Sequence, residues 1–305
     1  MKFQDLYDQA VAWSCYLENF PDPGRYLGLY GLSDQDATRF DCLGRFFPFR
    51  HYYARPDDCA GPRVVHDLGA CNERFVLPWI YWPTGSNDFI HGKSIIAPPA
   101  AIFNFLDNKV NAKRLFQSLK IPTPSWGCLR EGMPMVEKPI ENSAGGIGIR
   151  LTSQAAREGY FLERYLPGYR SIGVQLFVLE ATEFICADLM LIDDSQGPSF
   201  TFHSQRNMSE EELPPALIED LYRLGNHLKR EGYRGFLGVD ALVSDDDYHV
   251  LEVNPRGIAF LPGFFAARAL GWKEFETRTT REPPEEDEIV LLDFGIRKKV
   301  IKNRK

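Results

Sequence analysis

Apolar residues recur at helical spacing in two stretches of the chain. The first stretch fills positions i, i+3, i+4 and i+7, which form one face of an amphipathic helix: Ala112, Leu115, Phe116 and Leu119. Pro122 and Pro124 must end this helix because proline has no amide hydrogen, and Lys109 is therefore predicted at the helix N-terminus. A second helix is predicted from leucines with the same kind of spacing: Leu217, Leu221, Leu224 and Leu228.

Segments with strand composition lie between and after these helices. Four of them lie between the helices: residues 135–138, 160–164, 172–179 and 184–192. Residues 236–243 and 248–253 predict a hairpin around a polar turn at Asp245, Asp246 and Asp247. The strands do not alternate regularly with helices, so the predicted class is α+β. The sequence before about residue 100 shows neither period.

The predicted hairpin brings two carboxylates together. If residues 245–247 form the whole loop, Asp240 lies directly across from Glu252, and strand periodicity places Asn254 on the same face as Glu252. Carboxylates opposed at ~5 Å repel each other unless a cation lies between them. Oxygen ligands of this kind suit Mg²⁺, which takes one or two carboxylates together with phosphate oxygens. A solvated acidic face is the alternative, but the flanking residues are apolar.

Two other segments have the composition of a nucleotide site. Lys138 precedes the Gly-rich run 141–148, whose backbone N–H groups could approach phosphate oxygens while the lysine supplies a positive charge. A Gly-rich hairpin turn explains the same run equally well. Residues 161–168 run an apolar strand into a turn, with Tyr165 and Leu166 as potential walls for an adenine, although a plain strand end is the alternative.

Composition narrows the class of protein. With 305 residues, 44% hydrophobic and 25% charged, the chain can form two or three subdomains. No apolar run approaches the ~20 residues that span a bilayer, and the first residues resemble no signal or transit peptide, so we expect a cytoplasmic protein without membrane contact. The 6 cysteines are scattered and are expected to be reduced structural thiols. The net charge of -7 argues against nucleic-acid binding, and the basic residues 296–305 are expected to form a solvated tail.

In their order along the chain, these pieces resemble the ATP-grasp superfamily over roughly residues 98–263. The matching segments are a DK-type opening at 107–109, a second lysine strand at 136–139, a phosphate loop at 144–148, an adenine hinge at 163–166, and paired metal strands at 235–240 and 251–256. The paired metal strands are the most specific of these matches.

The resemblance implies an α+β ATP-grasp fold with a preceding N-terminal α/β domain. It divides the chain into an N-terminal domain at 1–97 that helps to shape the substrate pocket, a small subdomain at 98–166, and a large subdomain at 167–305 with a basic tail. ATP and Mg²⁺ are the implied cofactors, with Mn²⁺ as an alternative ion.

The resemblance also assigns roles to individual residues. Nucleotide binding falls to Lys109, Lys138, Ser143, Gly145, Gly146, Glu163, Arg164, Tyr165 and Leu166. Asp240, Glu252 and Asn254 would hold the metal ion, and Arg256 would steady the acyl phosphate or the carboxylate. Arg206, the second candidate catalytic residue beside Arg256, and His203 would lie over the triphosphate, with a surface position equally open to both. After Gly168 the chain departs from relatives that carry an acid near the ribose, so the ribose ligand stays open.

The resemblance predicts an ATP-dependent carboxylate-amine ligase. The γ-phosphate would activate a small-molecule carboxylate, such as an amino acid, as an acyl phosphate, and an amine would attack it to form an amide or peptide bond with release of ADP and phosphate. Such chemistry needs positioning and charge neutralisation rather than a catalytic Cys or Ser. A homodimer is compatible with this class. The alternatives are an ATP-grasp kinase and a non-catalytic nucleotide-binding regulator.

Overall fold

The computed structural model of the chain describes residues 1–7, 51–52, 64–65, 69–77, 89–90, 92–128, 132–141, 148–192, 200, 202–293 and 298–304. The elements in these residues are α1 (Phe3–Tyr7), β1 (His51–Tyr52), β2 (Val64–Val65), β3 (Phe75–Val76), β4 (Phe89–Ile90), β5 (Lys93–Ile95), α4 (Ala100–Asp107), α5 (Lys109–Ser118), β6 (Met135–Pro139), β7 (Arg150–Thr152), β8 (Tyr160–Arg164), β9 (Arg170–Val178), β10 (Thr182–Ile192), β11 (Phe202–Met208), η2 (Glu210–Glu212), α6 (Pro215–Arg230), β12 (Gly235–Val243), β13 (Tyr248–Asn254), α7 (Leu261–Leu270), β14 (Phe275–Thr280), β15 (Glu288–Asp293) and β16 (Lys298–Asn303). This mixture confirms the α+β class, and the predicted strands and helices are present.

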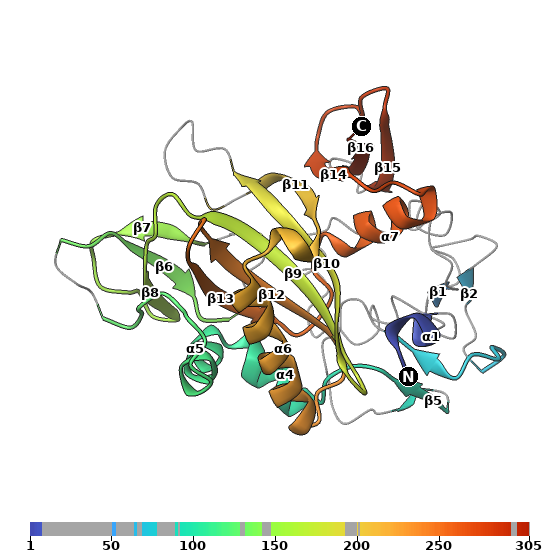
Figure 1. Ribbon diagram of the computed structural model, residues 1–305, viewed down its shortest axis with the longest axis horizontal. Coiled ribbons are helices and arrows are strands. Elements are labelled where there is room, and N and C mark those ends of the chain that lie inside the picture. Colours follow the sequence, from blue (N-terminus) through green and yellow to red (C-terminus); the bar gives the residue numbers. More distant parts are fainter. Residues whose placement is uncertain are drawn as a thin grey trace.

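An eight-stranded sheet forms the centre of the molecule (Figure 1), with the strand order β13-β12-β9-β10-β11-β14-β16-β15. All of its neighbouring strands are antiparallel. A separate three-stranded sheet, ordered β7-β6-β8, lies at the left of Figure 1, whereas β14, β15 and β16 lie at the upper right. The two sheets therefore extend the molecule in one direction, with β13 and α5 on the side of the smaller sheet.

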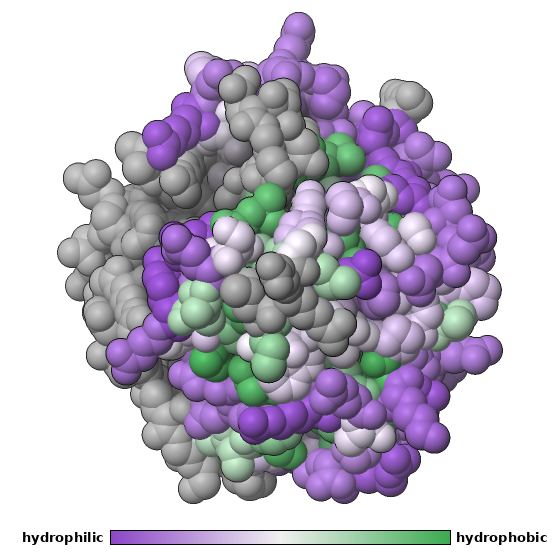
Figure 2. Space-filling model, turned by 90° about the vertical axis from the view of Figure 1, so that its left-hand side faces the viewer, coloured by the Kyte–Doolittle hydropathy of each residue, from purple (hydrophilic) through white to green (hydrophobic). Residues whose placement is uncertain are grey.

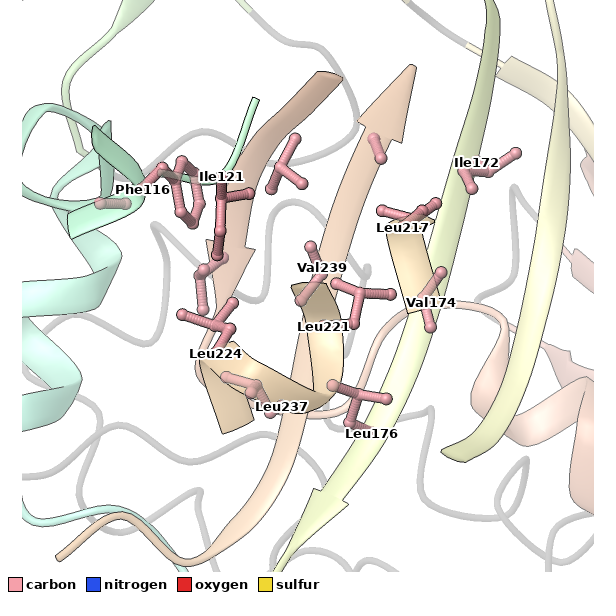
Figure 3. Packing of buried hydrophobic residues seen from close by; sticks show 14 of the residues in the cluster. Phe116, Ile121, Ile172, Val174, Leu176, Leu217, Leu221, Leu224, Leu237 and Val239 are labelled. Atoms are coloured by element: carbon pink, nitrogen blue, oxygen red, sulfur yellow. The ribbon is translucent and has the colours of Figure 1, made fainter. Parts of the chain in front are cut away.

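The helix α6 covers one face of the large sheet. Its leucines point onto the apolar side chains of β9 and β12 (Figure 3): Leu217, Leu221 and Leu224 on Val174, Leu176, Leu237 and Val239. Burial of one such leucine typically contributes about 1.5–3 kcal/mol. Pro215 occupies the first helical position, where its missing N–H breaks no helical bond. The predicted leucine spacing thus describes a helix that packs on the sheet core.

The opposite face of the sheet is covered by α7, α1 and the segment that joins β13 to α7. Phe3 packs between rings of the sheet and of α7, with centroid distances of 4.9 Å to Phe177 and 6.2 Å to Phe265. Gly238 of β12 allows the joining segment to lie directly on the strand, because a Cβ atom there would be 2.4 Å from Ile258 Cγ2. This face carries the polar residues that form the candidate site.

The predicted helix at Lys109 is α5, which starts at that residue and ends at Ser118. Asn108 caps its N-terminus by accepting a hydrogen bond from the Asn111 amide at 3.1 Å. The helix stops before the prolines, because Lys120 takes a left-handed φ of 56° and the Ile121 amide donates back to the Phe116 carbonyl at 2.9 Å.

The β12–β13 hairpin differs from its prediction in loop length but not in its central pairing. Val243 pairs with Tyr248, so the loop holds residues 244–247 and is one residue longer than predicted. A β-bulge beyond Asp240 restores the register, and Asp240 lies opposite Glu252 as predicted. The longer turn is stabilised by Ser244, whose amide donates to the Asp247 carbonyl at 2.8 Å.

The prediction of a solvated basic tail is wrong for the described residues 298–304. They form β16, which lies between β14 and β15 within the large sheet. Val300 and Ile301 are fully buried, and Lys299 is only 7% exposed. The apolar pair in the middle of the basic segment is what allows it to act as an inner strand, whereas Lys302 remains at the surface with Glu285 and Asp287.

The N-terminal third is described only in part, by α1 and the short strands β1 to β5. The expected α/β domain at 1–97 and the boundaries at 98–166 and 167–305 therefore stay predictions. Cys71, Cys128 and Cys186 are free thiols, in agreement with the expected reduced state of those residues. Among the described residues, none of the helices combines the length and the apolar character needed to cross a bilayer.

Candidate active site

The acidic pair of the hairpin lies on the face of the sheet opposite α6. Asp240 on β12 is paired with Glu252 on β13. Asn254 lies on the same face, since its amide nitrogen donates to Asp240 Oδ2 at 3.1 Å. Arg256 extends the group, because its guanidinium donates to Asn254 Oδ1 at 2.9 Å. The structure thus brings together all three predicted metal ligands and Arg256, one of the two predicted catalytic arginines.

The two carboxylates of the pair have opposite electrostatic environments. Burial, together with the neighbouring charge of Glu252, raises the pKa of Asp240 well above its ordinary value. Burial acts in the same direction on Glu252, but the ammonium groups of Lys109 and Lys138 outweigh it and lower the pKa of that carboxyl. Two half-buried carboxylates side by side can bind an added cation between them.

Lys109 approaches the acidic pair from the side of the three-stranded sheet. Its ammonium lies 3.4 Å from Glu252 Oε2, and its side chain is 8% exposed. The lysine is held in place by its backbone, whose amide donates to the Ile140 carbonyl at 2.9 Å at the end of β6. The first residue of α5 therefore connects the small sheet with the acidic pair.

Lys138 is the second cation, and it comes from β6 of the small sheet. Its ammonium donates to Glu163 Oε1 at 2.5 Å, and the charges of Glu163, Glu252 and Asp240 raise its pKa although burial opposes this. The second oxygen of Glu163 pairs with Lys113. The side chains of Lys113 and Glu163 are 0% and 2% exposed, so this is a fully buried group of two ammoniums and one carboxylate. We call Lys113, Glu163 and Lys138 the lysine triad.

Lys113 was missed by sequence reasoning. It follows Lys109 by one helical turn on α5, so its i+4 spacing on the same face was the available signal. Its ammonium also donates to Thr123 Oγ1 at 2.6 Å. Burial lowers the pKa of Lys113 to about 8, although Glu163 opposes the shift.

The predicted adenine hinge has two different parts. The Glu163 side chain points inward to the lysine triad, whereas Arg164 is exposed and Tyr165 and Leu166 are half-buried. The amide of Arg164 donates to the Ser125 carbonyl at 2.8 Å, and that of Tyr165 to the Pro134 carbonyl at 3.0 Å. These two amides are thus engaged within the protein, and the assignment of the hinge to adenine stays a prediction.

Arg206 is not brought to this group of residues. It pairs with Leu189 across β10 and β11, and Leu189 packs in the core on the α6 face. The Arg206 guanidinium lies 3.4 Å from Glu212 of η2, also on that side. Strand alternation makes its neighbour Gln205 the residue that faces the site. The structure therefore does not place Arg206 beside the acidic pair, and its assignment over a triphosphate stays a prediction.

Some predicted site residues lie outside the described part of the chain. These are Ser143, Gly145 and Gly146 of the Gly-rich run, and the side chain of His203. Their assignment to phosphate binding stays a prediction.

The donor set fits a hard divalent ion. Asp240 and Glu252 supply carboxylate oxygens, and Asn254 supplies the carbonyl oxygen of its amide. Mg²⁺ and Mn²⁺ prefer such oxygen donors over His and Cys. Because the third ligand of this set is an asparagine, it is not a group of three acidic, His or Cys residues, and the described residues hold no such group that could bind a metal ion. A site with two carboxylates leaves coordination positions for phosphate oxygens, as expected for a metal that arrives with a nucleotide.

The comparisons with known proteins define the class. Residues 106–259, just over half of the chain, match the family profile of the ATP-grasp domain. The chain therefore belongs to the ATP-grasp family, and its fold is the ATP-grasp fold. The residues that form the candidate site, from Lys109 to Arg256, all fall within this match. No curated protein matches the sequence.

Three solved structures illustrate the similarity of the fold. An ATP-grasp superfamily protein from Archaeoglobus fulgidus has a TM-score of 0.60 at 13% identity, over 97% of both chains. N5-carboxyaminoimidazole ribonucleotide synthetase from Thermus thermophilus has a TM-score of 0.56 at 14% identity, over 92% of this chain and 91% of that chain. The biotin carboxylase domain dimer of Hydrogenobacter thermophilus 2-oxoglutarate carboxylase, a complex with MgADP and bicarbonate, has a TM-score of 0.50 at 13% identity, over 70% of this chain and 65% of that chain.

Proposed function

We propose that this protein is an ATP-dependent carboxylate-amine ligase that forms an amide or peptide bond and releases ADP and phosphate. The observation that carries the proposal is the meeting of cations and carboxylates from three separate elements. The Lys109 ammonium of α5 lies 3.4 Å from Glu252. The charges of Glu252 and Asp240 raise the pKa of Lys138 on β6. Both carboxylates belong to the β12–β13 hairpin. A Mg-triphosphate presents the matching charges, with phosphates for the lysines and a metal ion for the carboxylates.

The residues of this site would divide the work between binding and reaction. Lys109 and Lys138 would neutralise the phosphates, and Asp240, Glu252 and Asn254 would hold Mg²⁺, which offsets the charge of the triphosphate when it is bound. Arg256 would bind the oxygens of the carboxylate as its acyl phosphate forms, because a planar guanidinium matches a carboxylate or a phosphate with two parallel hydrogen bonds.

The reaction then proceeds by two transfers. A carboxylate oxygen of the substrate attacks the γ-phosphorus of ATP, and ADP leaves, which gives an acyl phosphate. The nitrogen of an amine attacks the acyl carbon, and phosphate leaves with the bonding electrons while the amine loses a proton. The protein contributes orientation and charge neutralisation to both transfers and needs no covalent nucleophile.

The proposed subdomains fit this reaction. Lys138 belongs to the segment 98–166 and the acidic pair to the segment 167–305, so ATP would lie between the two.

The surface on the side of the small sheet (Figure 2) is mainly hydrophilic, with small hydrophobic groups among polar residues. Phe105, Met133 and Leu151 are the large hydrophobic side chains exposed in the described part. We propose small-molecule substrates, a carboxylate such as an amino acid and an amine acceptor, for a cytoplasmic enzyme.

The test is product formation over a panel of amino acids and amines with Mg-ATP. The expected result is ADP release that needs both a carboxylate and an amine, with one amide product per ADP. With hydroxylamine in place of the amine, an acyl phosphate gives a hydroxamate. Glu252→Gln, which should need more Mg²⁺, serves as the low-activity control at ordinary Mg²⁺ concentration. A stable phosphorylated product would instead identify a kinase, and nucleotide binding without ADP release over the whole panel would identify a regulator.

A further inference from the structure

The segment that carries Arg256 is held by two buried side chains from distant strands. We call residues 255–260, between β13 and α7, the Arg256 loop. Gln175 of β9 accepts a hydrogen bond from the Ile258 amide through Oε1 at 2.8 Å. Lys299 of β16 donates from Nζ to the Ala259 carbonyl at 2.6 Å. The two anchors hold consecutive residues of the loop, one by its donor and the other by its acceptor.

The second anchor, Lys299, is connected by hydrogen bonds to a buried carboxylate near the acidic pair. Lys299 Nζ lies 3.4 Å from Gln205 Oε1, and Gln205 donates to Asp188 Oδ2 at 2.8 Å. Asp188 faces Gly173 in the next strand, and Gly173 in turn faces Asp240. Side chains of β16, β11 and β10 thus link the Ala259 carbonyl to Asp188, and only the strand β9 separates Asp188 from Asp240.

Gly173 is what gives Asp188 its position in this chain. A Cβ atom on residue 173 would lie 2.6 Å from Asp188 Oδ1, closer than real Cβ contacts. The carboxylate therefore leans over the backbone of β9 toward Asp240, where its charge contributes to the raised pKa of Asp240. Asp188 is fully buried, so its place beside the site is fixed by its neighbours.

Packing alone does not explain a lysine at position 299. Its ammonium is buried, and the described residues place no carboxylate within 4.0 Å of it. Burial lowers the pKa of Lys299 to about 8, although Asp188 opposes the shift. A methionine would fill the same space without the desolvation of an ammonium. The structural gain that accompanies this lysine is its bond to the Arg256 loop.

We infer that Lys299 and Gln175 are positioning residues that hold the Arg256 loop so that the Arg256 guanidinium stays against Asn254, which in turn donates to Asp240. The inference extends the proposed function, since it assigns the C-terminal strand β16 to the support of the reacting groups. Neither side chain contacts the reacting atoms in this arrangement. Loss of either anchor should leave the acidic pair and the lysine triad in place and loosen only the loop.

Hydrogen exchange of the loop amides tests the anchoring directly. In Lys299→Met, amides of residues 256–260 should exchange at least about tenfold faster, while the strands β9 and β12 keep their protection. Gln175→Met should do the same by removing the acceptor of the Ile258 amide. Lys302→Met is the matched control, because it removes a surface lysine of the same strand, which pairs with Glu285 at 3.0 Å. In this variant the Arg256 loop should exchange at the wild-type rate.

Turnover tests whether the anchoring serves the reaction. Lys299→Met should lower the rate of ADP formation by about tenfold to a hundredfold, because a displaced reacting group costs rate, and change the dissociation constant of Mg-ATP by less than about threefold. Adding Lys299→Met to Arg256→Lys should lower the rate little further, since both changes act through the same guanidinium. A merely structural lysine would lower the melting temperature and add its full effect in the double variant.

The outcomes separate this inference from the proposed function. Unchanged loop exchange in both methionine variants overturns the inference, as does faster exchange with wild-type turnover. A wild-type chain without ADP formation overturns the proposed function, and the exchange result then still decides whether the anchors hold the loop. If Lys299→Met does not fold, Gln175→Met, which keeps the buried ammonium, gives the same two readouts.

Discussion

The Lys138 ammonium lies 2.5 Å from Glu163 Oε1, and the other oxygen of that carboxylate pairs with Lys113. One buried carboxylate thus serves two buried ammonium groups. The lysine triad carries a net positive charge beside the acidic pair, in a place from which water is largely excluded. Such a charge favours a phosphate group at this position.

Replacement of Lys138 by alanine should weaken nucleotide binding. The substitution removes a charge-assisted contact of about 1.5–3 kcal/mol, so the dissociation constant of Mg-ATP should rise about tenfold or more. Calorimetry with Mg-ADP and Mg-ATP measures it. Lys229→Ala, which removes an exposed lysine that binds the Glu180 carbonyl, is the control. An unchanged dissociation constant in Lys138→Ala would remove this lysine from the nucleotide site.

Amide substitutions of the acidic pair should have opposite effects on stability. Asp240→Asn relieves the repulsion from Glu252 that accompanies burial in raising the pKa of Asp240, so its melting temperature should stay or rise. Glu252→Gln takes the partner from the Lys109 ammonium at 3.4 Å, so its melting temperature should fall. Scanning fluorimetry without nucleotide compares the two variants.

The same two variants should both need more Mg²⁺ for turnover, since each loses one of two anionic ligands without a change of shape. Titration of ADP formation with Mg²⁺ measures this requirement. Full turnover of Glu252→Gln at ordinary Mg²⁺ concentrations would show that the hairpin has a structural role only.

Arg256→Lys should lower turnover far more than it weakens ATP binding. The lysine keeps the charge but not the planar fork, and loss of one preorganised donor typically costs about a hundredfold to a thousandfold in rate. Turnover, ATP affinity and melting temperature are measured on Arg256→Lys and Arg256→Ala. Near-normal turnover with a lowered melting temperature in the alanine variant would mean that Arg256 only holds the strand end through Asn254.

Glu137 should control part of the stability in acid. Burial opposes the shift, but hydrogen bonds from Arg150 and Arg157 lower the pKa of this carboxyl from 4.5 to about 2. A carboxyl whose pKa is depressed by folding adds stability above its unfolded pKa, and this stability is lost as the pH falls through the folded value. The melting temperature of the wild type should therefore exceed that of Glu137→Gln above about pH 5, and the difference should shrink as the pH falls toward 2. A difference that is constant over this range would contradict the assignment.

The residues predicted correctly from the sequence were those fixed by local pattern. The spacing of the α6 leucines and the start of α5 at Lys109 depend on one helical turn at a time. The pairing of Asp240 with Glu252 was predicted through a loop that is one residue too short, and the β-bulge beyond Asp240 compensates for it. A bulge leaves no clear signal in the composition of a strand, so the pairing was correct although its derivation was incomplete.

The surroundings of other residues depend on contacts between distant strands, which the sequence pattern does not show. Arg206 and Gln205 are neighbours, and only the register of β10 against β11 decides which of them faces the site. Lys299 belongs to a segment whose charge indicated a solvated tail, and its burial follows from pairing with β14 and β15. No spacing within the segment could have shown that pairing.

The place of β16 inside the large sheet also has a consequence for how the protein is made. Lys109 and Lys138 are synthesised early, and both can contact the β12–β13 hairpin once residue 254 has left the ribosome. The bond from Lys299 to the Ala259 carbonyl can form only after β16 has inserted between its two neighbours. Until then the Arg256 loop lacks one of its two anchors, so a nascent chain should acquire its nucleotide-binding lysines before it acquires a firmly held arginine.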